Sequence, residues 1–359
     1  MTQWDASGMT QEYEYYEVDT GTWQDKRMLK TVTSCTITRD STSDTLGSAT
    51  FAADELYGEM YVRAYLITIQ NRVRQRHPLG TFLVQSPSMS FDGKVSTSDF
   101  EAYTPLIELK ENNPPVGYYI PKNASILDKA ADIIKNTAKA RAPIVYVSND
   151  AAGAGSIVSN FVSDGNETWV KYLTEYLACA NYRIDLDEYG RILLSPIQPI
   201  RTLQPTFVYT DDNSSILYRD ISVTKDIYSV PNVVEVTYSD KNYTLSSVAK
   251  NEDPDSATSI PTRGREIIKR ISDPKLNGVP TQPMVDEYAR QELEKESTIQ
   301  CKVTYKHGYN NVRVGDCIRI DYRRAGILIE KAQVISQKIS CKDGCPVSET
   351  AVFNMPLWG

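Results

Sequence analysis

Apolar and polar residues alternate along the first third of the chain, as they do in β-strands that bury one face. Segments 31–40 and 47–53 show this period of two, and two apolar runs over 61–70 and 79–87 flank a polar turn. The pattern predicts a first β unit between Leu29 and Leu109, which we assign to a domain over residues 1–115.

A helical period replaces this alternation in the middle of the chain. Apolar residues recur at helical spacing after Ser125 and again after Thr168, and both residue types cap helix N-termini. Two strand-like segments, 182–187 and 190–196, follow the second helix and are joined by a turn with the pattern D-x-x-G. We therefore expect a smaller helical α/β domain over residues 116–200.

Strand patterns return after Pro205 and continue to residue 355. Between the early and the late strands, one helix is predicted from about Met284 to Glu296, with Val285, Ala289 and Leu293 on one side. These segments predict a second β unit over residues 201–359 that contains this one helix.

The two β units match each other at a constant offset of 251 residues. The matched pairs are Ile67 with Ile318, Ile69 with Ile320, Arg72 with Arg323, Asp92 with Asp343, and Gly93 with Gly344. Both copies contain a strand with I-x-I-x-x-R, a polar turn, a second apolar strand and a D-G turn. Two interpretations are open: a duplicated β unit, or the spacing that any two twisted hairpins share.

The composition supports a β-rich assembly protein. The chain has 23 Tyr against 7 Phe and 2 His, and amphipathic aromatic residues suit half-exposed strands and subunit contacts. Its 359 residues are enough for about two to three domains. We predict a β-rich α+β fold in which two similar β barrels flank the smaller helical α/β domain.

The charge balance and the lack of long apolar runs narrow the function. With 39 Lys and Arg against 46 Asp and Glu, the formal net charge is −7, so we predict no sequence-specific binding of nucleic acid. No apolar run approaches the roughly 18 residues that span a bilayer, so we predict no membrane span. The N-terminus is polar and acidic, and we expect the protein to be assembled in a cytoplasm.

Residue patterns typical of catalysis are missing. His77 and His307 are the only histidines, and neither lies in a metalloprotease, serine-hydrolase or Cys-His motif. We predict no catalytic residue, no cofactor and no enzymatic activity. A β-rich carbohydrate-active enzyme or a carbohydrate-binding protein stays an open alternative, because the spatial separation of 46 carboxylates is invisible in sequence.

Four of the six cysteines, Cys301, Cys317, Cys341 and Cys345, fall within 45 residues. If the strands that flank the turn near Asn310 pair with each other in one register, Cys301 and Cys317 face each other, and the four could form a metal site. Two of the cysteines lie singly on strands rather than in a second knuckle. We therefore expect reduced thiols and no bound metal.

Basic residues cluster at two predicted hairpin tips. Arg72, Arg74 and Arg76 alternate along one strand end, and Arg323 and Arg324 lie at the matching place in the second unit. A solvated hairpin tip explains such a cluster, and so does ionic contact with a neighbouring subunit or ring. We keep all five arginines as interface candidates.

Several longer segments together resemble the baseplate hub family of contractile phage tails, related to late control protein D and to the hubs of defective prophage tails. These segments are LGTFLVQSPSMSFDGKVSTSDF, PKNASILDKAADII, ETWVKYLTEYLACANYRIDLDEYGRILL, PNVVEVTYS, and a helix followed by VRVGDCIRIDY. The resemblance covers most of the chain and consists of spacing patterns rather than invariant chemistry. The hub of a non-contractile tail fits the same patterns.

The resemblance implies a homotrimeric virion protein at the tail tip. Two tube-like barrels per subunit would adapt a six-fold tail tube to a three-fold central spike and would let DNA pass through the bore. It implies as partners the tail tube or distal tail ring protein and the spike protein, with the tape measure protein and other baseplate proteins as further candidates. We expect the bore to carry more acidic and neutral side chains than Lys and Arg, because it must not bind DNA.

Overall fold

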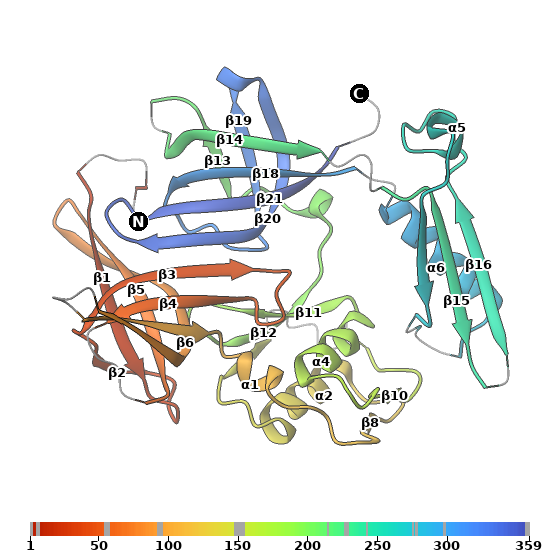
Figure 1. Cartoon of the computed structure of the whole chain (residues 1–359), viewed down its shortest axis with the longest axis horizontal. Helices are drawn as coiled ribbons and strands as arrows, with labels where there is room; N and C mark the ends of the chain where they lie inside the picture. The colour runs from red at the N-terminus through yellow and green to blue at the C-terminus, as the bar shows by residue number, and fades with distance from the viewer. Residues whose placement is uncertain are drawn as a thin grey trace.

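The computed structural model describes residues 3–4, 8–53, 58–91, 96–146, 155–213, 215–225, 230–241, 243–274, 276, 279–296 and 299–355. Thirteen strands of these residues form one continuous sheet, and three smaller sheets and several helices lie around it (Figure 1). The chain is therefore the β-rich α+β protein that the alternating pattern predicts.

The first β unit comprises seven strands. They are β1 (Thr10–Val18), β2 (Asp25–Met28), β3 (Val32–Asp40), β4 (Gly47–Ala53), β5 (Met60–Gln70), β6 (Val73–Phe91) and β7 (Ser96–Tyr103). Their spatial order is β3-β4-β7-β6-β5-β1-β2. The side chains that alternate along β3 and β4, among them Ile37, Ala49 and Phe51, are buried in one apolar core.

The second β unit comprises six strands and the 3₁₀ turn η3 (Arg323–Ala325). The strands are β13 (Phe207–Thr210), β14 (Leu217–Lys225), β18 (Ile299–Gly308), β19 (Cys317–Tyr322), β20 (Ile327–Cys341) and β21 (Pro346–Met355). Strand β14 pairs with β18, β18 with β21, β21 with β20, β20 with β19, and β19 with β13.

The two β units share one strand order. The order β3-β4-β7-β6-β5 in the first unit corresponds to β14-β18-β21-β20-β19 in the second. This correspondence favours a duplicated β unit. The alternative was that the match at an offset of 251 residues reflects only the spacing that any two twisted hairpins share. The pairs Ile67/Ile318, Ile69/Ile320 and Arg72/Arg323 fall on β5 and β19 and on the turns after them. Asp92 and Gly93 lie outside the described residues.

A direct strand pairing joins the two units. The last part of β20 runs antiparallel to β3, with Cα partners from Ser336 opposite Asp40 to Cys341 opposite Cys35. The two β units, which the sequence predicts as two barrels, are thus parts of one sheet that continues from unit to unit.

The middle unit lies below the sheet in Figure 1 and is mainly helical. Its elements are α1 (Ile107–Lys110), β8 (Tyr119–Ile120), α2 (Ile126–Asp132), the π-helical turn η1 (Ile133–Thr137), β9 (Ile144–Tyr146), β10 (Phe161–Val162), α4 (Trp169–Ala178), β11 (Tyr182–Leu186), β12 (Ile192–Pro196) and the 3₁₀ turn η2 (Ile200–Thr202). Both predicted helices are present, and Thr168 caps α4 by accepting a hydrogen bond from the Lys171 amide. The apolar face of α4 is buried in the core of this unit.

A separate projecting unit stands beside the main body, at the right of Figure 1. It comprises β15 (Val233–Ser239), β16 (Thr244–Lys250), α5 (Ile260–Arg263), β17 (Ile268–Ser272) and α6 (Gln282–Glu296). The helix expected at about 284–296 is present, but it packs on the three-stranded sheet β16-β15-β17 and not on the second β unit. Valines of β15 and of α6 form its own small core, and periodicity alone could not indicate which sheet that apolar stripe covers.

Candidate functional site

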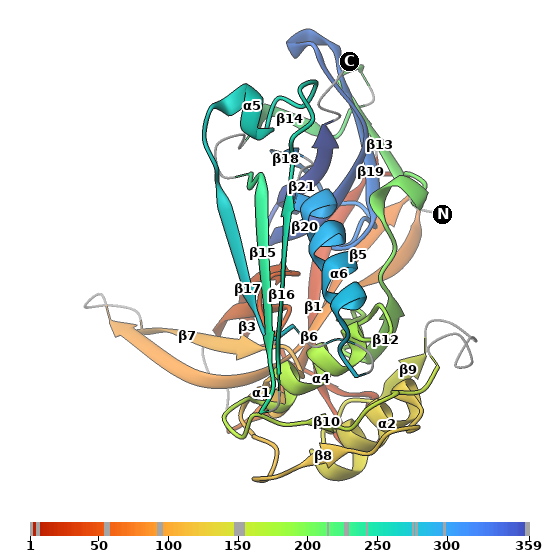
Figure 2. The same cartoon turned by 90° about the vertical axis from the view of Figure 1, so that its right-hand side faces the viewer.

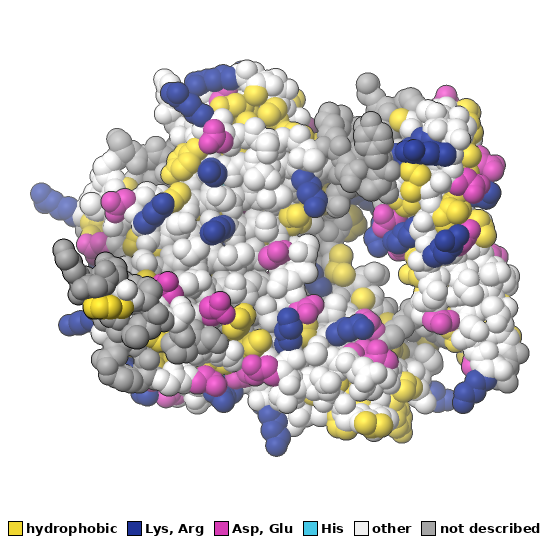
Figure 3. All heavy atoms as spheres, viewed as in Figure 1, with side chains coloured by type: hydrophobic (Ala, Val, Ile, Leu, Met, Phe, Trp, Pro, Cys, Tyr) yellow, Lys and Arg dark blue, Asp and Glu magenta, His cyan; other side chains and the backbone are white. Residues whose placement is uncertain are grey.

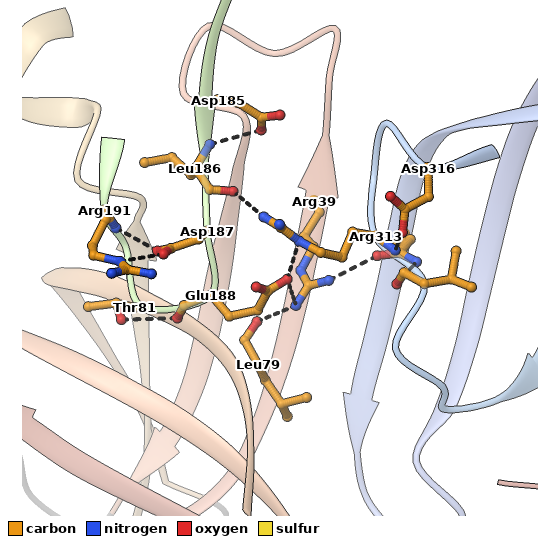
Figure 4. A network of polar contacts seen from close by, with 12 residues as sticks. Arg39, Leu79, Thr81, Asp185, Leu186, Asp187, Glu188, Arg191, Arg313 and Asp316 are labelled. Carbon is orange, nitrogen blue, oxygen red and sulfur yellow. Dashed lines mark hydrogen bonds and ion pairs between the residues drawn. The ribbon is translucent and has the colours of Figure 1, made fainter. Parts of the chain in front are cut away.

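The hairpin turn between β11 and β12 is inserted between the two β units (Figure 4). The predicted D-x-x-G turn is present: the Gly190 amide donates to the Asp187 carbonyl at 2.9 Å. The Arg191 amide and guanidinium both bind the Asp187 carboxylate, at 2.8 and 2.5 Å. At this turn, residues 187–190, the middle unit meets both β units.

Glu188 at the tip of the turn bridges arginines of both β units. Its carboxylate lies 2.6 Å from Nε of Arg313, which precedes β19, and 3.6 Å from Nη2 of Arg39 on β3. Arg313 also donates to the Leu186 carbonyl at 2.6 Å, and Arg39 donates to the Leu79 carbonyl at 2.6 Å. Burial by itself would lower the pKa of Arg313, but Glu188 and nearby aspartates outweigh it and raise that pKa. The Glu188 carboxylate is therefore the shared counter-charge of two guanidinium groups.

The backbone of the turn is also hydrogen-bonded to side chains of the first β unit. The Tyr189 carbonyl accepts hydrogen bonds from Trp23 Nε1 at 2.7 Å and from Arg63 Nη2 at 3.1 Å. Arg63 is buried in the middle of β5 and also binds Asp25 at 3.0 Å and Thr81 at 2.8 Å. Because this buried guanidinium binds both the first β unit and the Tyr189 carbonyl, it fixes the position of the middle unit against the first β unit.

We expect Gly190→Ala to lower the free energy of unfolding by about 2–3 kcal/mol. Gly190 has φ +70°, and a Cβ there would lie 2.8 Å from Thr81 Cβ. Urea denaturation measures the loss. The matched control is Gly264→Ala: φ is +65°, and no atom of the described residues lies within 4 Å of the added Cβ, so only the backbone cost of about 1 kcal/mol applies. Equal losses for the two variants would contradict a tight fit at the junction.

A cavity of about 420 Å³ opens beside this turn. Residues from the middle unit and from both β units line it, including Thr42, Lys171 and Val314. Its carboxylates at Asp185, Asp187 and Glu188 each bind an arginine, so they serve the structure of the junction.

A buried polar network centred on Glu349 lies inside the second β unit. The Glu349 carboxylate accepts hydrogen bonds from the Tyr305 hydroxyl and from Gln337 Nε2 at 2.6 Å, and His307 Nε2 lies 3.4 Å away. Burial and then the charge of Glu349 raise the pKa of Tyr305 well above its usual range. Gln337 accepts from Arg39 at 3.1 Å, which connects this network to the junction.

The five candidate arginines differ in their contacts within the chain. Arg74 and Arg76 bind within the chain, Arg74 to Glu14 at 2.6 Å and Arg76 to Asp25 at 3.0 Å. Arg76 also stacks over the Tyr65 ring at 3.5 Å. Arg72 is exposed on the turn after β5, with φ +64°.

Arg323 and Arg324 lie on the turn after β19, the counterpart of the Arg72 turn. Arg323 pairs with Asp321 at 3.2 Å and remains 82% exposed, and Arg324 lies 3.6 Å from Asp211. Both stay candidates for contact with another subunit or ring.

The four clustered cysteines do not come together. Strand β18, which holds Cys301, pairs with β14 and β21, whereas β19, which holds Cys317, pairs with β20 and β13. The register that would set Cys301 opposite Cys317 therefore does not form. Cys341 instead lies opposite Cys35, and Cys345 shares their apolar core. The described residues contain no cluster of His, Cys, Asp and Glu that could hold a metal.

The sequence patterns missed the junction residues Arg39, Arg313 and Glu188. One signal was present: Arg63 interrupts the apolar run of residues 61–70. A charge within a strand whose neighbours are all apolar needs buried partners.

The sequence predicts no membrane span, and no helix in the described part of the chain has the length and apolar character that crossing a bilayer requires.

No protein-family model and no curated protein matches this sequence. Among solved structures, the chain is similar to a tail protein from Neisseria meningitidis MC58, with a TM-score of 0.69 and 12% identity over 95% of this chain and 96% of that one. It is also similar to the 43 kDa tail protein of prophage MuSo2 from Shewanella oneidensis, with a TM-score of 0.65 and 11% identity over 95% and 98%. A third similar chain comes from the PdpA–VgrG complex of Francisella, with a TM-score of 0.56 and 10% identity over 97% of this chain and 58% of that one.

These similarities extend over nearly the whole chain, including both β units and the parts between them. The resemblance to tail hub proteins is thereby confirmed at the level of the fold. We conclude that this chain has the fold of phage and prophage tail proteins.

Proposed function

We propose that this chain is the structural hub of a phage-type tail, in which three copies form a ring between the tail tube and the central spike. The observation that carries the proposal is the repeated strand order of the two β units. Three copies of a chain with two like units present six like units, and closed cyclic symmetry is the usual arrangement of identical subunits.

The exposed hairpin tips support contact with a six-fold neighbour. Arg72 and Arg323 occupy matching turns, after β5 and after β19. A ring of three copies would repeat this cation six times, as docking onto a six-fold tail tube or distal tail ring requires. On the face of the molecule seen in Figure 3, basic and acidic side chains are interspersed.

The middle and projecting units suit contacts with further tail proteins, the central spike foremost. Two similar structures are tail proteins and another contains VgrG, which supports a place in a phage-type tail, and the place that we propose is the tail tip of a virion. Three copies carry a formal charge of −21, three times the −7 of one chain, which has the sign that repels DNA from a bore. The role we propose is structural and needs no catalysis.

We expect sedimentation or light scattering to give a mass of about 121 kDa, three times 40.3 kDa. Negative-stain images should show a ring with a central bore. A chain that stays monomeric in the presence of its tail tube protein would contradict the proposal. So would hydrolysis of peptidoglycan or a model glycoside that is lost when a single carboxylate is changed, and that result would favour the carbohydrate-active alternative.

A further inference from the structure

We propose that residues 85–91 of β6 pair, as an antiparallel strand, with β14 of a second copy, and that this pairing joins the copies head to tail. The proposal rests on the proposed ring and names the strands that close it. Its basis is the pairing that already joins the two units inside one chain.

Inside the chain, β20 is long enough to serve two neighbours along one edge. Residues from Ile327 to Gln333 pair with β19, and residues from Ser336 to Cys341 extend past β19 and pair with β3. The other edge of β20 pairs with β21. The C-terminal extension of β20 is therefore what binds the first unit to the second.

Strand β6, the counterpart of β20, also extends past its neighbour β5. In the described part of the chain, however, β14, the counterpart of β3, does not pair with this extension. Its pairing with β5 ends where Val84 lies opposite Met60, and residues 85–91 continue along β7 alone. Among the described residues, no strand pairs with the other edge of this extension. Figure 2 shows β6 and β7 projecting from the body as a long hairpin.

Strand β14 is the counterpart of β3, and its outer edge has no partner strand among the described residues. Residues 35–40 of β3 read CTITRD, and residues 221–226, which begin in β14, read ISVTKD. The two segments agree in residue class at nearly every position. The surface to which β20 binds thus occurs a second time, at the end of the sheet.

Two sets of aligned residues across the strands fix the register. Ile37, Ala49, Ala102 and Val84 form one set in the first unit, and Val223, Val303, Ala351 and Val334 form its counterpart. Cys35, Phe51, Phe100 and Pro87 form the other set, and Ile221, Tyr305, Glu349 and Gln337 form its counterpart. From Val84 to Pro87 the chain advances three residues while its partner strand β7 advances two, from Ala102 to Phe100. From Val334 to Gln337 it also advances three while β21 advances two, so both ladders contain the same bulge.

Transfer of the β3·β20 register to the new pair predicts its contacts. Lys338 lies opposite Thr38 and Cys341 opposite Cys35, so Ser88 should lie opposite Thr224 and Phe91 opposite Ile221 of the next copy. Phe91 is 66% exposed in the single chain, and this contact would cover it. The unpaired backbone groups of both edges would also find partners.

Cysteine pairs test the register directly. We expect the double variants Ser88→Cys/Thr224→Cys and Phe91→Cys/Ile221→Cys, oxidised with copper phenanthroline, to give covalent trimers on a non-reducing gel. Opposite pairs alternate between two backbone geometries along a ladder, and these two pairs are three residues apart, so one of them has the closer Cβ approach.

Two controls accompany these variants. The double variant Ser88→Cys/Ser222→Cys keeps the same face of β14 but is two residues out of register, and it should cross-link at least tenfold more slowly. The unchanged chain reports any cross-link through its six free cysteines.

The outcomes separate this inference from the proposed function. A ring that forms in solution while neither in-register pair cross-links, or while the control cross-links equally fast, overturns the strand pairing and leaves the hub role standing. A chain that neither assembles nor cross-links at any soluble concentration overturns both.

Discussion

Glu349→Ala is expected to lower the free energy of unfolding of the second β unit by about 3–5 kcal/mol. The Glu349 side chain is fully buried and is the shared acceptor for Tyr305 and Gln337, with His307 beside it. Its removal takes away the acceptor of the buried Tyr305 hydroxyl and one of the two acceptors of Gln337 Nε2, which also donates to the Val312 carbonyl at 2.9 Å. A buried donor that loses its acceptor costs its desolvation energy. Because Gln337 also accepts from Arg39, the loss should reach the β3·β20 pairing.

Urea denaturation and hydrogen exchange of the β18 and β21 amides measure this effect. Glu349→Gln keeps an oxygen acceptor for Tyr305 and should lose clearly less than Glu349→Ala. The surface control is Glu330→Ala: this side chain is 63% exposed, pairs with Arg319 at 3.2 Å, and should change stability by less than about 1 kcal/mol. A loss at Glu349 as small as that at Glu330 would show that the network is dispensable.

Glu188→Ala is expected to loosen the attachment of the middle unit to both β units, at a cost of about 2–3 kcal/mol. Its carboxylate is mostly buried and is the acidic partner of both Arg39 and Arg313. Without it, two guanidinium groups of the junction lose their shared counter-charge. Backbone contacts through Tyr189 remain, so we expect local opening rather than unfolding of the whole chain.

Hydrogen exchange resolves such local opening. A cost of about 2 kcal/mol corresponds to roughly 30-fold faster exchange of the β11 and β12 amides, with β18 and β21 unchanged. Glu294→Ala on α6 is the control, because this side chain is 77% exposed and pairs only with Arg290 of its own helix in the described part of the chain. Unchanged exchange in β11 and β12 would contradict the clamping role of Glu188.

Elements that depend on near neighbours in the chain could be predicted. The helix that begins after Ser125, the cap at Thr168, the apolar face of α4 and the turn that ends at Gly190 all depend on residues within one or two turns of each other. The Ser125 hydroxyl makes no capping hydrogen bond and instead donates to the Asp128 carboxylate at 2.7 Å. The match at an offset of 251 residues is also local, since both hairpins carry the same pattern, and it left duplication open until the strand order was known.

Contacts between distant segments could not be predicted. Arg39, Glu188 and Arg313 come from three units, and each alone is an ordinary charged residue in a polar stretch. The conditional pairing of Cys301 with Cys317 does not form, because it required consecutive strands to be neighbours, whereas β18 and β19 do not pair with each other.

The sequence by itself thus determined the β-rich character and the helices, because hydrophobic periods and caps act over a few residues. It raised the internal repeat as one of two interpretations, and the strand order of the structure favoured it. Only the tertiary structure decided that β20 runs beside β3, that α6 covers a sheet of its own, and that the turn carrying Glu188 is bound between the β units. The physical reason is that backbone hydrogen bonds are alike at every strand edge. Which edge a strand joins is therefore decided by the burial and charge compensation of the whole fold.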